Sequence, residues 1–288
     1  MRHELTPPRR LTAKDNPLLK TIRKLTRNPE KDDAGRMVAE GVRVLEELAA
    51  LPGDGLAVEA AVVTDGFGGA PRERRLLDGW HARRVRVFQV APELFASVSG
   101  VRTPQGALAL VGAPRHSLGR LRLAGAPLLL GALGVQDPGN LGTLIRTAAA
   151  AGAAAVLTLR GTVSARNPKA LRASAGAFFH IPVVEGLTAG ELVSYCGSRN
   201  IRIYRTDVRE GVPHTRADLA TAAAILVGNE GGGMEALGDD FARLPAIHIP
   251  MPGRAESLNV AAAAAVILFE AARQRGGAPQ PIAPKRRA

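Results

Sequence analysis

Short, almost wholly apolar segments alternate with helical patterns through the second half of the chain, and this alternation constrains the fold most strongly. Residues 128–135 and 155–159 are two such segments, and the apolar spacing of 141–151 between them predicts a helix that ends at Gly152. Strands that are apolar on both faces are typical of a parallel sheet covered by helices on both sides. We therefore predict an α/β fold with a parallel sheet, whose further strands are 201–204, 224–227 and 246–249.

The first half of the chain shows a shorter and more highly charged form of the same alternation. Asn16 followed by Pro17 is a typical helix start, and apolar residues recur after it at helical spacing. Strand and helix patterns then follow one another to residue 111, which predicts a small N-terminal α/β domain. We expect this domain at 1–113, a basic linker at 114–126, the parallel-sheet domain at 127–275 and a flexible basic tail at 276–288.

The charge of the chain indicates a polyanionic partner. Lys and Arg total 38 against 26 Asp and Glu, which gives a net charge of +12 and a sequence pI of about 11.0. Nucleic acid is the first candidate, and an aromatic content of only 3% favours phosphate contacts over base stacking. The basic side of the first helix is either an ordinary solvated face or an RNA-binding edge, for which the candidates are Asn16, Lys20, Arg23 and Lys24.

Several common classes of site are absent from the sequence. Cys196 is the only cysteine, which excludes an intrachain disulfide and a cysteine-based zinc site, and we predict no metal. No G-x-G-x-x-G fingerprint follows the strand at 128–135, and Met234 stands where a P-loop that starts at Gly228 needs lysine. The histidines form no H-E-x-x-H motif, and no G-x-S-x-G elbow occurs.

The N-terminus lacks an apolar signal core, and no apolar run approaches the ~20 residues of a membrane span, so we expect a soluble cytoplasmic protein.

Polar, glycine-bearing loops follow three of the predicted strands, at 136–143, 228–234 and 250–259. Ligands of open α/β sheets bind beyond the carboxyl ends of strands, so these loops form the candidate site. Each loop also has a purely structural interpretation. Asp137 begins an ordinary turn sequence, Asn140 suits a helix N-cap, and Ser257 suits the N-cap of a last helix that runs to residue 273.

The three loops resemble the three signature motifs of the SpoU/TrmH family of RNA 2′-O-ribose methyltransferases, within the SPOUT superfamily. The motifs are D-P-G-N-L-G-T-L-I-R-T-A from Asp137, I-L-V-G-N-E-G-G-G-M from Ile225 and I-P-M-P-G-R-A-E-S-L-N-V from Ile249, in the family's order and spacing. The segment 168–176 also matches a family stretch. The N-terminal half resembles, more weakly, the substrate-binding domain of members that act on ribosomal RNA. The residues that carry this likeness are Asn16-Pro17 with Lys20, Glu40-Gly41 and 103–106.

The resemblance implies a function, a fold and an assembly. It implies S-adenosylmethionine-dependent 2′-O-ribose methylation of RNA, with 23S ribosomal RNA favoured because of the additional N-terminal domain. Transfer RNA as the substrate, or a non-catalytic RNA-binding assembly factor on the same fold, remain the alternatives. The family folds its SPOUT catalytic domain with a C-terminal trefoil knot and pairs two copies as a homodimer through the last helix. Here that helix contains an alanine run at 261–265, which also suits internal packing.

The resemblance also assigns roles to individual residues. The cofactor S-adenosylmethionine would contact Gly228, Ile249, Met251 and Leu258. Besides the N-terminal basic residues, RNA would contact Lys169 and Arg172. The catalytic residues would be Asn140, Arg146, Glu230, Ser257 and Asn259.

Arg146 has two possible roles in such a reaction. Proposals for the family make this arginine the general base. The reference pKa of an arginine side chain is about 12.5–13.8, so deprotonating one near pH 7 costs roughly 7–9 kcal/mol. A charged Arg146 that binds an RNA phosphate and stabilises the developing alkoxide is the role that this energy favours.

Overall fold

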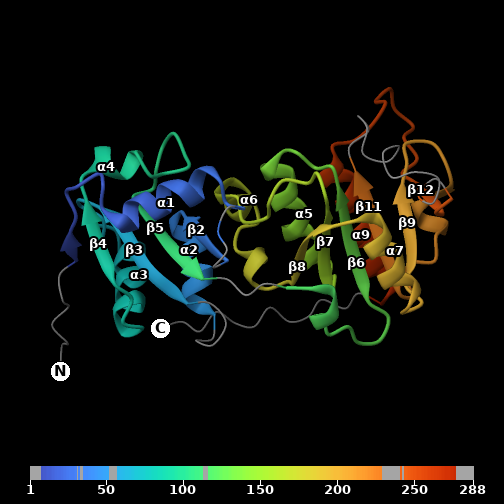
Figure 1. Cartoon of the computed structure of the whole chain (residues 1–288). Coiled ribbons are helices and arrows are strands. Elements are labelled where there is room, and N and C mark those ends of the chain that lie inside the picture. The colour runs from blue at the N-terminus through green and yellow to red at the C-terminus, as the bar shows by residue number, and fades with distance from the viewer. Residues whose placement is uncertain are drawn as a thin grey trace.

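The computed structural model describes residues 8–30, 32, 35–51, 57–112, 116–228, 241 and 243–276. These residues form two α/β lobes that lie side by side, each built on its own sheet (Figure 1). Within the described ranges, the N-terminal lobe comprises 8–112 and the C-terminal lobe comprises 116–276. Two α/β units in this order agree with the expectation from the sequence.

The N-terminal lobe has a mixed five-stranded sheet. Its strands are β1 (Arg9–Arg10), β2 (Arg36–Glu40), β3 (Val58–Thr64), β4 (Val87–Val90) and β5 (Ala107–Gly112), and its helices are α1 (Pro17–Arg27), α2 (Val42–Ala50), α3 (Pro71–Ala82) and α4 (Pro92–Ala96). The sheet order is β1-β4-β3-β5-β2, with β5 antiparallel to both of its neighbours. Helix α1 begins as predicted, because Asn16 Oδ1 accepts a hydrogen bond from the Leu18 backbone N at 2.9 Å and Pro17 occupies the first helical position.

The C-terminal lobe has a seven-stranded sheet in which every paired strand is parallel to its neighbour. The strands are β6 (Leu128–Leu133), β7 (Ala155–Leu159), β8 (Val183–Leu187), β9 (Arg202–Thr206), β10 (Val212–Pro213), β11 (Ala223–Gly228) and β12 (Ala246–His248). Their order is β10-β12-β9-β11-β6-β7-β8. The helices are α5 (Pro138–Ala150), α6 (Pro168–Ala173), α7 (Ala189–Gly197) and α9 (Val260–Gln274), with short 3₁₀ turns η1 (Leu118–Arg120), η2 (Ala177–Phe179) and η3 (His214–Arg216). The predicted parallel sheet is confirmed.

Different helices cover the two faces of the large sheet. One apolar cluster joins α5 and α9 to one face, through residues such as Leu144 and Ile267. A second cluster joins α7 to the other face, through residues such as Leu192. Leu118 and Leu121, from the predicted linker, pack against this second cluster. Both faces of the sheet are therefore buried, as its apolar strands require.

Two helices of the C-terminal lobe start at other residues than the sequence predicts. Helix α5 begins at Pro138, because Asp137 caps it by accepting a hydrogen bond from the Asn140 backbone N at 2.9 Å. Helix α9 is capped by Asn259 and not by Ser257, since Asn259 Oδ1 accepts from the Ala261 backbone N at 2.9 Å. The expected N-cap roles of Asn140 and Ser257 are therefore wrong, and neither side chain is used to start a helix.

Candidate functional site

The three polar loops start from the same edge of the large sheet. The strands β12, β9, β11 and β6 are adjacent in this order and parallel, so their carboxyl ends point to one side. The first loop follows β6 and the second follows β11, its direct neighbour, whereas the third follows β12. In Figure 1 the third loop, in orange to red, rises above this edge before it enters α9. The parallel topology thus brings the starts of all three loops to one place.

A hydrogen bond joins the first loop to the third. Asn259 Nδ2 donates to Asn140 Oδ1 at 3.1 Å, although the two residues are 119 positions apart. Each asparagine lies in the N-terminal turn or cap of a helix, Asn140 in α5 and Asn259 before α9. The two amides meet because these two helix starts lie at the same edge of the sheet. Glu230, which was predicted to act beside them, lies outside the described residues.

Arg146 and Ser257 present exposed polar groups. Arg146 lies on α5, roughly two helical turns beyond Pro138. Within the described part of the chain, no residue forms an ion pair or a hydrogen bond with the Arg146 guanidinium or the Ser257 hydroxyl. Both groups are therefore available to a ligand that carries phosphate or hydroxyl groups.

The residues predicted to bind the cofactor lie at and after the ends of β11 and β12. Gly228 ends β11, and a Cβ atom there would lie 3.3 Å from the Leu133 carbonyl oxygen, so glycine avoids crowding between the strands. Ile249 directly follows β12 and packs against the core, and Met251 is half-buried. Leu258, next to the Asn259 cap, is 41% exposed. Apolar side chains together with a few polar groups are the usual lining of a small-molecule site.

A fourth loop at this edge was missed by the sequence analysis. It follows β9, which lies between β11 and β12. Its Asp207 backbone N donates to the Ile247 carbonyl at 2.9 Å, and the Arg205 guanidinium donates to Asp207 at 2.6 Å and to Glu210 at 2.5 Å. Burial opposes ionisation of Asp207, but the backbone N–H groups of Arg209 and Glu210, together with Arg205, bring its pKa below the usual range. The strand itself was predicted, so the carboxyl-end rule applied to its polar loop would have found these residues.

The basic residues predicted to contact RNA in the N-terminal lobe lie along α1. Lys20 and Lys24 are exposed, and Lys20 Nζ lies 3.2 Å from Asp15 Oδ1 in a solvated pair. Arg23 is half-buried and donates to the backbone carbonyl and the hydroxyl of Ser97, both at 3.3 Å. The two lysines, four positions apart, face the same side of the helix. They remain the stronger candidates for phosphate contacts, and the RNA contact itself stays a prediction.

The two basic residues predicted to contact RNA from the C-terminal lobe are engaged inside the chain. Lys169 Nζ lies 2.7 Å from Asp137 Oδ2, and this hydrogen bond holds the pKa of Asp137 below its usual range. Arg172 Nη1 lies 3.4 Å from Glu40 Oε2, which belongs to the N-terminal lobe. The Arg172 side chain is 24% exposed. Their contact with RNA stays a prediction, whereas the structure shows both as partners of carboxylates.

Comparison with known proteins decides the family. Residues 127–269 match the SpoU rRNA Methylase family model, and residues 16–109 match the model of the MRM3-like substrate binding domain. The 23S rRNA (guanosine(2553)-2'-O)-methyltransferase RlmP of Bacillus subtilis (strain 168) is 33% identical over 261 residues, which are 91% of this chain and 98% of that protein. The chain belongs to the SpoU rRNA methylase family.

Other members of the family match this SpoU rRNA methylase in sequence or in structure. The 23S rRNA (guanosine-2'-O-)-methyltransferase RlmB of Xylella fastidiosa (strain 9a5c) is 35% identical over 213 residues, 71% of this chain and 85% of that protein. The SpoU methyltransferase AviRb from Streptomyces viridochromogenes, solved with the cofactor AdoMet, matches with a TM-score of 0.76 and 27% identity. This match covers 91% of our chain and 100% of AviRb. All three polar loops lie inside the stretch that the SpoU model matches.

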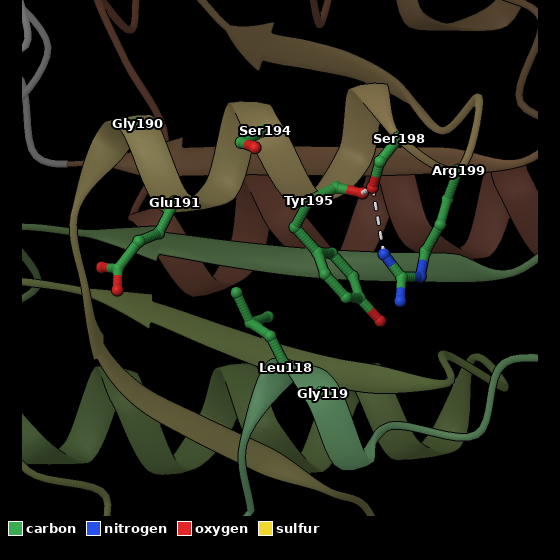
Figure 2. A pocket seen from close by; sticks show the side chains of 8 residues that line it. All are labelled: Leu118, Gly119, Gly190, Glu191, Ser194, Tyr195, Ser198 and Arg199. Carbon is green, nitrogen blue, oxygen red and sulfur yellow. Dashed lines mark hydrogen bonds between the residues drawn. The ribbon is translucent and has the colours of Figure 1, made fainter.

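A pocket of this SpoU rRNA methylase is lined by residues that belong to none of the three loops (Figure 2). It has a volume of about 490 Å³ and lies between α7 and η1. Arg199 lies over the ring of Tyr195, with its guanidinium carbon 4.1 Å from the ring centroid, and donates to Ser198 Oγ at 3.0 Å. None of the predicted site residues lines this pocket. Among the described His, Cys, Asp and Glu side chains, no group of three could hold a metal ion.

Proposed function

We propose that this SpoU rRNA methylase transfers a methyl group from S-adenosylmethionine to the ribose 2′-oxygen of a guanosine in 23S ribosomal RNA. The observation that carries the proposal is the Asn259–Asn140 hydrogen bond, which joins two of the three family motifs at the carboxyl edge of the sheet. The choice of RNA is supported by the relatives RlmP and RlmB, both named as 23S rRNA guanosine methyltransferases. A transfer RNA substrate and a non-catalytic assembly factor are the alternatives that experiment has to separate.

The residues at the ends of β11 and β12 fit S-adenosylmethionine. When bound, this cofactor supplies an electrophilic methyl group on a sulfonium sulfur whose positive charge disappears on transfer. Gly228 is half-buried at the end of β11 and offers backbone groups to polar edges of the adenosine, and Ile249, Met251 and the exposed Leu258 offer apolar contacts to its ring. The solved complex of AviRb with AdoMet supports the same cofactor for this chain.

The polar residues of the loops orient the ribose and stabilise charge. The ribose 2′-oxygen would accept the methyl group that the bound cofactor supplies, and its hydroxyl proton would pass to water, because a charged Arg146 cannot take it up. Asn140 and Ser257 hydrogen-bond the ribose, and Asn259 holds Asn140 in place. A charged Arg146 stabilises the developing alkoxide and an adjacent phosphate. Glu230 lies outside the described residues, and its catalytic role stays a prediction.

Methyl incorporation tests the proposal. The purified chain is titrated with S-adenosylmethionine and then incubated with radiolabelled cofactor and either 23S rRNA or tRNA from a strain that lacks the gene. We expect cofactor binding and incorporation into 23S rRNA at one guanosine, located by mapping 2′-O-methyl groups. Incorporation into tRNA alone would establish the first alternative, and binding without incorporation into either RNA would establish the second.

The Asn259→Asp variant tests the contact between the loops. Aspartate keeps the acceptor oxygen that caps α9, so we expect stability to change by less than ~0.5 kcal/mol. It lacks the Nδ2 donor to Asn140, and we expect kcat to fall about 10- to 100-fold because Asn140 loses its orientation. Calorimetry and the incorporation assay measure the two effects. Asn167→Asp, at the N-cap of α6, is the matched control; full activity in both variants would show that the contact is dispensable.

We further propose that a second copy of the chain covers the outer face of α9. Ala264 and Ile267 are buried inside the C-terminal lobe, whereas Val266 is 40% and Phe269 53% exposed on the other side of the helix. The alanine run therefore serves internal packing in part, and the larger apolar side chains form the exposed face. Large exposed apolar groups on a helix are typical of an interface, and the family's homodimers use this helix.

Phe269→Asp is expected to abolish the proposed dimer, because a carboxylate would be buried in an apolar interface. Light scattering during size exclusion measures the mass of the parent chain and of the variant at the same concentration. Val212→Asp is the matched control, since Val212 is a comparably exposed residue, at 45%, on β10. We expect the control to remain dimeric, and a dimeric Phe269→Asp variant would exclude this face of α9.

We also propose a role for each domain, a knotted path of the C-terminal chain and a cellular location for the protein. We assign RNA binding to 1–113 and methyl transfer to 127–275, joined by 114–126, in line with the separate family models. We also propose a C-terminal trefoil knot, for which the resemblance to the SpoU/TrmH family is the sole support, because knots are very rare in other folds. None of the described helices is long and apolar enough to cross a membrane. A cytoplasmic location rests on the proposed ribosomal substrate.

A further inference from the structure

The segment of α6 and η2 belongs to the packing of both lobes. Leu171 of α6 is 1% exposed and lies in the apolar core of the N-terminal lobe, together with Met37 and Leu45. Phe179 packs against the same core, and Phe178 packs against the cores of both lobes. Figure 1 shows α6 between β2 and α5. A piece of the C-terminal lobe is therefore inserted into the N-terminal lobe.

A buried ion pair accompanies this apolar contact. Glu40, the last residue of β2, is 1% exposed. Its carboxylate accepts hydrogen bonds from the Ser99 hydroxyl and from the Gly100 backbone N at 2.8 Å, and the Arg172 guanidinium lies 3.4 Å away. Burial lowers the pKa of Arg172, and the charge of Glu40 acts in the opposite direction. Because Ser99 and Gly100 hold the carboxylate in one place, the ion pair ties Arg172 to a defined point on the N-terminal lobe.

On its other side α6 is in direct contact with the helix that carries the first motif. A Cβ atom at Gly142 of α5 would lie 2.2 Å from the Ala170 carbonyl oxygen, so the two helices touch through their backbones. Lys169 pairs with Asp137 at 2.7 Å, and Asp137 in turn caps α5 at the Asn140 backbone N. A displacement of α6 therefore displaces α5 and Asn140 with it, because interiors this closely packed transmit movement.

We propose that Arg172 is a positioning residue, whose ion pair with Glu40 sets the orientation of the N-terminal lobe relative to α5 and so aligns bound RNA with Asn140 and Arg146. The inference rests on the proposed function, because it needs an RNA that both lobes hold. The apolar contact at Leu171 attracts the lobes without a preferred direction, whereas a hydrogen-bonded carboxylate with one cation opposite it is directional. This assigns Arg172 to the interface rather than to the RNA surface.

Activity of matched variants is the first measurement. Arg172→Met keeps an unbranched apolar stem, shorter than that of arginine, and removes the charge. Arg172→Met combined with Glu40→Gln leaves no unpaired charge if the single variant does not fold. We expect kcat/KM for 23S rRNA to fall about 10- to 100-fold in both, with the Kd for S-adenosylmethionine unchanged within about twofold. Arg172→Lys, which keeps the charge, should recover part of the loss. Arg43→Met, at an exposed position of α2, is the control.

The distance between the lobes is the second measurement, and it does not depend on activity. Cys196 is the only cysteine and is buried, which raises the pKa of its thiol to about 11, so Cys196→Ser gives a background without reactive thiols. Spin labels on Arg75→Cys in α3 and Arg216→Cys in η3 then report the separation of the lobes by pulsed electron resonance. We expect a narrow distance distribution in this background and a broad or shifted one after Arg172→Met.

The activity and the distance between the lobes together decide whether Arg172 is a positioning residue. A broadened distribution with reduced turnover and unchanged cofactor affinity supports a positioning role. Reduced turnover with an unchanged distribution overturns it and returns Arg172 to direct RNA contact, and full turnover in the doubly substituted variant overturns it as well. If the parent chain methylates no RNA, the proposed function fails, while the distance distribution still shows whether the ion pair orients the lobes.

Discussion

Arg146→Ala is expected to lower kcat for methyl transfer about 10³-fold, while the Kd for S-adenosylmethionine changes less than about twofold. Arg146 is exposed on α5 and has no hydrogen-bonding partner among the described residues, so its guanidinium is available to the RNA. It projects from the helix that also carries Asn140. Truncation of Arg146 removes the group in both of its possible roles, as a general base or as a positive charge beside the alkoxide. Neither role involves holding the cofactor, so cofactor affinity should not change.

Arg146→Lys separates the two roles. A fixed positive charge survives in lysine at neutral pH, so a purely electrostatic role predicts partial activity with no new pH dependence below about pH 9. A general base must be neutral to act, and lysine reaches that state more easily than arginine, so a base role predicts activity that rises steeply with pH. The pH profile of single-turnover methylation in the parent chain and the lysine variant measures the difference.

Arg216→Ala provides the control for the alanine variant. Arg216 is likewise exposed but belongs to η3 and to none of the three loops, and we expect its truncation to leave both kcat and cofactor affinity unchanged. Circular dichroism and calorimetric titration with S-adenosylmethionine show whether the Arg146→Ala chain is folded and loaded. Turnover by a folded, loaded Arg146→Ala variant at the rate of the parent chain would exclude both roles.

Local apolar patterns predicted five of the seven strands of the large sheet, and they failed at β8, where a polar residue has its partners in a distant loop. The strand at 155–159 was predicted at its observed bounds, because all five of its residues are buried. β8 was missed because Glu185 interrupts its apolar run. The Glu185 carboxylate accepts hydrogen bonds from the Ser164 hydroxyl at 3.0 Å and the Ala165 backbone N at 2.7 Å, and Arg166 lies 3.3 Å away. This polar residue is satisfied by a loop some 20 positions earlier, which no local periodicity contains.

Some features of the candidate site could likewise be predicted from the sequence, and others could not. The motifs and the edge of the sheet that they share could be predicted, because glycine-bearing polar loops after apolar strands indicate the carboxyl ends of a parallel sheet. The contact between Asn140 and Asn259 could not, since it depends on which residue caps each helix. Nor could the position of Arg172, whose partner Glu40 lies 132 positions away. Among basic residues in a basic chain, the sequence does not distinguish one that faces RNA from one that joins two lobes.

Gly142→Ala is expected to destabilise the chain by at least about 3 kcal/mol, or to prevent folding, although alanine is the better helix former. A Cβ atom at this position would lie 2.2 Å from the Ala170 carbonyl oxygen and 2.6 Å from Ala173 Cβ. Neither neighbour is the mobile end of a long side chain, so α5 and α6 would have to separate. Chemical denaturation followed by circular dichroism measures the free energy of unfolding.

Gly79→Ala in α3 supplies the matched comparison. Nothing lies within 4 Å of a Cβ atom built at Gly79, so the same substitution should stabilise the chain by about 0.5–1 kcal/mol, the usual gain in a helix interior. The two substitutions would change the free energy of unfolding in opposite directions, because Gly142 lies at the backbone contact of α5 with α6 and Gly79 has no such contact. In any folded fraction of Gly142→Ala we expect S-adenosylmethionine to bind and RNA methylation to fail, because separating α5 from α6 releases the N-terminal lobe from the first motif. A Gly142→Ala chain as stable as Gly79→Ala would show that the two helices are not in contact, and the proposed coupling between the lobes would fail with it.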